Sequence, residues 1–85
     1  MLAAAMPEHT FTKLQGQYLA YISAYTKLHG IPPAEADMQR YFKVTPPSVH
    51  QMILTLERRG LIRRTPSRSR SIEVLVSRVQ IPVLD

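Results

Sequence analysis

The residues with the most obvious chemistry are the arginines near the end of this 85-residue chain. Residues 58–78 hold seven arginines and one glutamate, whereas the rest of the chain holds four basic and five acidic residues. The whole positive excess of the chain, +5, therefore lies in about a quarter of its length. An arginine guanidinium makes paired hydrogen bonds to phosphate oxygens and guanine edges. This concentration indicates a surface that faces a polyanion; the alternative is a solvated, solubilising hairpin.

A second group of polar residues precedes the arginines. Its members are short or forked donors and acceptors, which reach base edges and phosphates. Gln51 can pair with adenine through two hydrogen bonds, and His50 can donate to a guanine acceptor or a phosphate. An ordinary polar helix face is the alternative for both. The predicted DNA contacts are Thr45, Pro47, Ser48, His50, Gln51 and Thr55 on a recognition helix, with Lys43, Arg68 and Arg70 on the wing and backbone.

Three helices are expected to position these residues, at about 12–29, 34–42 and 46–59. Thr12 with Gln15 forms a capping-box pattern, and Gly30 ends the first helix. Ala34 is a poor N-cap, so the second helix should fray at its start. Thr45 caps the third helix, and Gly60 ends it.

Apolar residues at helical spacing predict the packed faces of these helices. They are Leu14, Tyr18, Tyr21, Ile22, Tyr25 and Leu28 in the first helix, Ala36, Met38, Tyr41 and Phe42 in the second, and Val49, Met52, Ile53 and Leu56 in the third. Residues 61–64 and 71–76 favour two strands joined by a turn at 65–70. We therefore predict a mainly α fold with a small β-hairpin: a winged helix-turn-helix of three helices and a two-stranded antiparallel wing.

The domain is expected to span residues 11–76. Residues 1–10 should form a flexible tail, and residues 77–85 a C-terminal tail, a linker or an added edge strand. At 85 residues the chain is long enough for one small core.

Several function classes find little support in the composition. The chain has no cysteine, which fits a reducing cytoplasm, and no apolar run of the length that spans a membrane. His9, His29 and His50 show no metal-ligand spacing, and the isolated glycines form no phosphate loop. We expect no catalytic activity, no metal and no cofactor.

The sequence resembles the N-terminal DNA-binding domain of LexA-type repressors over roughly residues 11–76. The resemblance rests on Phe11-Thr12, His29-Gly30-Ile31-Pro32-Pro33, Thr45-Pro46, Leu56-Glu57-Arg58-Arg59-Gly60-Leu61-Ile62-Arg63-Arg64 and Arg70-Ser71-Ile72-Glu73-Val74. It implies a winged helix that binds duplex DNA, with base contacts on Thr45, Pro47, Ser48, His50 and Gln51.

The chain departs from the family pattern at several points. Lys43 replaces the usual turn glycine, Ala34 replaces a capping threonine, and the recognition positions lack the family's acidic and asparagine residues, so a different operator is expected. LexA repressors continue into a self-cleaving peptidase domain that dimerises them, and that domain is expected to be absent here. Residues 81–85 resemble the start of that junction.

We therefore expect a bacterial or phage-type, cytoplasmic transcriptional regulator, a repressor that binds double-stranded DNA as a homodimer. One winged helix reads only a few base pairs, so paired half-sites would supply the missing specificity. A winged helix used as a protein-interaction adaptor is the rival, which an exposed Leu54 would favour. RNA binding is a third option.

Overall fold

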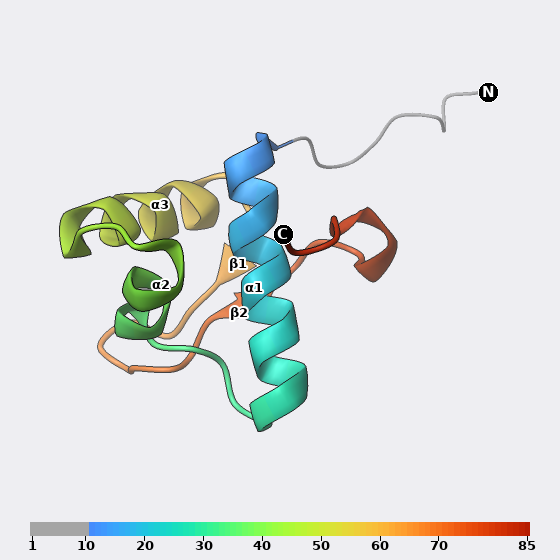
Figure 1. Ribbon diagram of the computed structural model, residues 1–85. Coiled ribbons are helices and arrows are strands. Elements are labelled where there is room, and N and C mark those ends of the chain that lie inside the picture. Colours follow the sequence, from blue (N-terminus) through green and yellow to red (C-terminus); the bar gives the residue numbers. More distant parts are fainter. Residues whose placement is uncertain (1–10) are drawn as a thin grey trace.

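The computed structural model describes residues 11–85 and has the expected architecture (Figure 1). Its elements, in chain order, are α1 (Lys13–His29), α2 (Glu35–Phe42), α3 (Pro46–Arg58), β1 (Ile62–Arg63), β2 (Glu73–Val74) and the 3-10 helix η2 (Arg78–Gln80). The two strands pair antiparallel, with Ile62 opposite Val74. Three helices with a two-stranded sheet confirm the predicted class. The tail expected at residues 1–10 lies outside the described residues.

Local capping sets the helix ends. Thr12 and Gln15 form the predicted capping box of α1, with reciprocal bonds of 3.0 and 3.1 Å. Gly30 ends α1 in the left-handed region, at φ 79°. Gly60, also left-handed, ends α3: its N–H donates to the Glu57 carbonyl while the next residue donates to Leu56. This pair of bonds is a Schellman motif, which turns the chain from α3 into β1.

The core lies where the three helices meet the sheet. Its buried side chains come from the three helices, from β1 and from residues next to the strands. The ring of Tyr18 stacks on Phe42 at 4.1 Å, which joins α1 to α2. The buried cluster consists of Tyr18, Leu19, Ile22, Met38, Val49, Ile53, Leu56, Leu61, Ile62, Ile72 and Val76. Because α3 contributes Val49, Ile53 and Leu56 to it, its opposite face is free for contacts outside the domain.

The packed face of α1 differs from the predicted one at both ends of the helix. Leu14 and Leu28 are 53% and 79% exposed, whereas Leu19, which the predicted face left out, is fully buried. Regular spacing alone therefore overestimates the length of the buried stripe.

The C-terminal segment, predicted as a tail, a linker or an added edge strand, folds back against α1 (Figure 1). Gln17 of α1 donates to the Val83 carbonyl at 2.9 Å and accepts from the Asp85 N–H at 2.7 Å. Tyr41 of α2 donates to the Asp85 carbonyl at 2.7 Å. Gly16 permits this packing, because a Cβ at that position would lie 3.0 Å from Pro82 and from the Phe11 ring.

Candidate nucleic-acid interface

The turn between α2 and α3 sets the position of α3. Lys43 ends α2 in the left-handed region, at φ 58°, a backbone conformation that glycine adopts more readily than lysine. Thr45 then caps α3, its hydroxyl 3.4 Å from the Ser48 N–H and 2.9 Å from the Ser48 hydroxyl. Pro46 occupies the first helical position, where a missing N–H has no cost.

The start of α3 presents the predicted polar residues on its surface. Thr45, Pro47, Ser48, His50 and Gln51 are all exposed, while Val49 between them is buried. Thr55, one turn further along, is half-buried and accepts from the Arg58 guanidinium at 3.3 Å. The structure therefore brings five of the six predicted recognition-helix residues together on one accessible turn, and Thr55 lies at the edge of that surface.

His50 is joined to the preceding helix. Its Nδ1 lies 3.3 Å from a carboxylate oxygen of Glu35, at the start of α2. Glu35 also lines a hollow of about 360 Å³ between the start of α2 and the loop of the hairpin. Glu35 thus adjoins both the exposed turn of α3 and the hairpin loop, so these two candidate DNA-binding features lie at one side of the domain.

The hairpin loop is closed by a serine. The Ser71 hydroxyl accepts from the Thr65 N–H at 3.0 Å and donates to the Arg68 carbonyl at 2.9 Å. Below the loop, Arg63 and Glu73 face each other across the ladder and form an ion pair at 2.6 Å. The Thr65 N–H is taken by the Ser71 hydroxyl and not by a backbone carbonyl, so the ladder ends at Arg63 and Glu73. The strands are therefore shorter than the predicted 61–64 and 71–76.

The two predicted wing contacts lie in different surroundings. Arg68 is exposed, and its guanidinium makes no hydrogen bond or ion pair with any residue between 11 and 85. Arg70 instead turns toward the helices, where it donates to the Tyr25 hydroxyl at 3.2 Å, the Pro32 carbonyl at 3.4 Å and the Asp37 carboxylate at 3.1 Å. In this arrangement only Arg68 offers an uncommitted guanidinium at the loop.

Asp37 is the acid on which the Arg70 contact depends. Its side chain is only 9% exposed and also accepts from the Ala34 N–H at 2.8 Å and from Arg40 at 2.6 Å. The Ala34 hydrogen bond, and then the Arg70 and Arg40 charges, hold the pKa of Asp37 below its ordinary 3.8 against the opposing effect of burial. The same carboxylate supplies the cap that Ala34 cannot provide itself.

Other arginines of the basic segment are also engaged within the domain. Arg64 pairs with Glu57 at 3.0 Å, and Arg59 donates to the Gln15 side chain at 2.9 Å. The first contact holds the hairpin to α3, and the second joins the end of α3 to α1. The arginines of residues 58–78 therefore fall into two groups: some bond to other residues of the domain, and others remain exposed.

Lys43 and Gln51 complete the set of predicted contacts. Both are exposed and lack a side-chain partner within residues 11–85, so their polar groups are available. Over the same residues, no group of three or more acidic or histidine side chains could hold a metal ion, and no helix could cross a membrane.

Sequence reasoning missed three residues that shape this surface: Glu35, Asp37 and Ser71. Neither acid was among the predicted site residues, and Ser71 was predicted only as part of the strand 71–76. The capping pattern of Asp37 three residues after position 34 was a signal for its bond to the backbone. Nothing in the sequence connected it with an arginine 33 residues away.

Comparison with known proteins agrees with this geometry. The sequence model of the LexA DNA binding domain matches residues 8–71, which include all three helices and the hairpin loop. The LexA repressor of Thermosipho africanus (strain TCF52B) is 41% identical over 75 residues, which are 85% of this chain and 37% of the relative. The LexA repressor of Thermosipho melanesiensis is 36% identical over 64 residues, 75% of this chain and 32% of the relative.

The chain thus spans about a third of the length of these curated relatives. The family match covers well over half of the chain and includes every element that forms the candidate interface except β2. The chain belongs to the LexA DNA-binding domain family.

Proposed function

We propose that this chain binds double-stranded DNA in a sequence-specific way and represses transcription by occupying its site. The observation that carries the proposal is the exposed polar turn at the start of α3, with the unpaired Arg68 at the same side of the domain. The matched relatives are named repressors, which supports the same function. Such a surface suits a helix in the major groove and a loop against the backbone.

Within this proposal, the residues of the surface have separate tasks. Ser48, His50 and Gln51 read base edges, while Lys43 and Arg68 contact phosphates. Glu35 engages Nδ1 of His50, so Nε2 is the ring nitrogen left for a base edge. Arg70 contributes by holding the loop in place, since its guanidinium is engaged by Tyr25 and Asp37.

A second copy completes the site in this proposal. One recognition helix discriminates only a few base pairs, at about 1–3 kcal/mol for each. Two copies on paired half-sites would bring the specificity into the range of repressors, so binding to an inverted repeat should be cooperative. The rival role as a protein-interaction adaptor is weaker, because Leu54 is half-buried and so is not the exposed leucine that would favour it.

Fluorescence anisotropy on duplex DNA across a salt series tests the proposal. Each phosphate contact adds about 0.9 to the log–log slope of affinity against salt, so Arg68→Ala should lower the slope by about that amount. Arg63→Ala is the matched control, because Arg63 is already paired with Glu73 and its removal should change the slope less. Gln51→Ala should change which duplexes are preferred in a selection from random sequence.

If no duplex binds detectably at low salt, the proposal of DNA binding is wrong. Equal losses from Arg68→Ala and Arg63→Ala would show that the slope follows net charge and not a phosphate contact. Stronger competition by duplex RNA than by duplex DNA would favour the RNA-binding option.

A further inference from the structure

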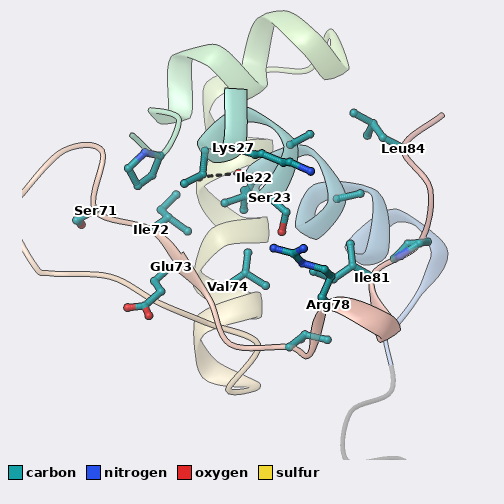
Figure 2. A pocket seen from close by; sticks show the side chains of 16 residues that line it. Ile22, Ser23, Lys27, Ser71, Ile72, Glu73, Val74, Arg78, Ile81 and Leu84 are labelled. Carbon is teal, nitrogen blue, oxygen red and sulfur yellow. Dashed lines mark hydrogen bonds between the residues drawn. The ribbon is translucent and has the colours of Figure 1, made fainter. Parts of the chain in front are cut away.

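An open groove of about 920 Å³ runs between α1, β2 and the C-terminal segment (Figure 2). Apolar residues of α1, β2 and the C-terminal segment line the groove, and the side chains that α1 contributes are mostly short, so the groove is deep there. The principal apolar residues are Ala20, Ala24, Val74, Val76, Ile81 and Leu84. A groove of this size, with mostly aliphatic walls and a few polar groups, has the features of a small-molecule site.

Two basic side chains reach over this groove from opposite walls, Lys27 from α1 and Arg78 from η2 (Figure 2). Neither makes a hydrogen bond or ion pair with any other residue in 11–85. The Ser23 hydroxyl lines the same groove. Glu73 is the one acid in the lining, and its carboxylate is committed to Arg63 at 2.6 Å. The charge left without a partner in the groove is therefore entirely positive.

We propose that the groove binds a small amphipathic anion, with one carboxylate head group and an aliphatic body. The carboxylate lies between Lys27 and Arg78, accepts from both and from the Ser23 hydroxyl, and the aliphatic body covers Ala24 and Val74. Charge-assisted hydrogen bonds to a carboxylate are stronger than neutral ones. The aliphatic body is stabilised by its removal from water against the apolar wall.

This site is separate from the proposed DNA-binding surface. Its outer wall is formed by residues beyond position 71, after the region that matches the family. Figure 1 shows η2 on the side of α1 opposite to the hairpin loop. The inference therefore does not rest on DNA binding, and its failure would leave the proposed function intact.

Titration of the full chain with octanoate, followed by amide NMR shifts, tests the inference, with octanol as the neutral analogue. Saturable shifts should appear at residues 20–27 and 74–84. Lys27→Ala and Arg78→Ala should each weaken octanoate binding about three- to tenfold, the range for partly screened charge contacts. Lys13→Ala is the matched control, because Lys13 is an exposed, unpaired base at the other end of α1 and its removal should have no effect.

Ala24→Trp supplies a second test, because Ala24 lines the groove from an exposed position where a larger side chain fits without disturbing the core. The substitution should fill the groove and abolish the octanoate shifts while the melting temperature stays close to that of the wild type. Equal affinity for octanol and octanoate, equal losses from Lys13→Ala and Arg78→Ala, or shifts outside the groove would each overturn the proposal.

Discussion

Replacing Asp37 by alanine should destabilise the domain more than the loss of any exposed carboxylate. The substitution removes the acceptor of the Ala34 N–H, which leaves the first turn of α2 without a cap. It also releases Arg70 from its contact between the hairpin loop and the helices. Loss of the capping bond should cost about 1–2 kcal/mol. The contacts with Arg40 and Arg70 add little to that figure, since those side chains are 72% and 39% exposed and therefore screened.

For a domain of this size, each kcal/mol lowers the melting temperature by about 4–8 °C, so Asp37→Ala should melt about 5–15 °C below the wild type. Thermal unfolding followed by circular dichroism gives this value. Glu73→Gln is the matched control, because it removes a carboxylate whose ion pair is exposed on both sides. Its melting point should stay within about 3 °C of the wild type, since an exposed pair contributes less than about 0.5 kcal/mol.

The loss of stability in Asp37→Ala should also depend on pH and should become smaller as the pH falls. The pKa of Asp37 is lower in the folded state than its ordinary 3.8, so the ionised carboxylate favours folding. This stabilisation is complete above the unfolded value and disappears as the pH falls through the lower, folded value. The difference between wild type and Asp37→Ala should therefore narrow between about pH 5 and about pH 2.

Two results would refute this reasoning about Asp37. One is a melting point of Asp37→Ala equal to that of Glu73→Gln at pH 7. The other is a difference from wild type that stays constant down to pH 2. Asp37→Asn separates the contribution of the hydrogen bond from that of the charge, because its amide oxygen can still accept from the Ala34 N–H while the negative charge is lost. It should fall between the wild type and Asp37→Ala at pH 7.

Three further substitutions test other parts of the fold. Gly16→Ala should fail to gain the roughly 1 kcal/mol that alanine gives in a helix, because its Cβ would press on Phe11 and Pro82, and a melting curve checks this. Lys43→Gly should raise stability by up to about 1 kcal/mol by relieving left-handed backbone, yet weaken DNA binding at low salt in an anisotropy assay. Ile53→Ala should cost about 2–5 kcal/mol in urea unfolding, because the side chain is fully buried.

The helix boundaries were predictable because their causes are local. Thr12, Thr45, Gly30 and Gly60 each act on backbone groups within a few residues, and each helix begins and ends within one residue of the predicted position. The exposed turn of α3 was predictable for the same reason, since the spacing of its buried residues leaves the others outside.

The contacts that organise the hairpin loop and the C-terminal segment were not predictable. Arg70 and Asp37 are 33 residues apart, and Gln17 and Asp85 are 68 apart. Neither pair has a periodicity or motif that joins its members. Whether an arginine contacts DNA or a carboxylate of its own domain depends on which acids the fold brings within reach.

Some arginines of residues 58–78 are paired with carboxylates and others are not, so the net charge of the chain does not act as one DNA-attracting surface. Arg63, Arg64 and Arg70 each meet a carboxylate, so their charge is largely compensated within the domain. Arg68 and Arg78 meet none among the described residues. The hairpin loop, which carries Arg68, and η2, which begins at Arg78, lie on opposite sides of α1 (Figure 1). One continuous basic patch would attract DNA to the single surface that it covers. Two separated guanidiniums instead provide one local attraction at the hairpin loop and another at the groove, so each can be removed by mutation without weakening the other.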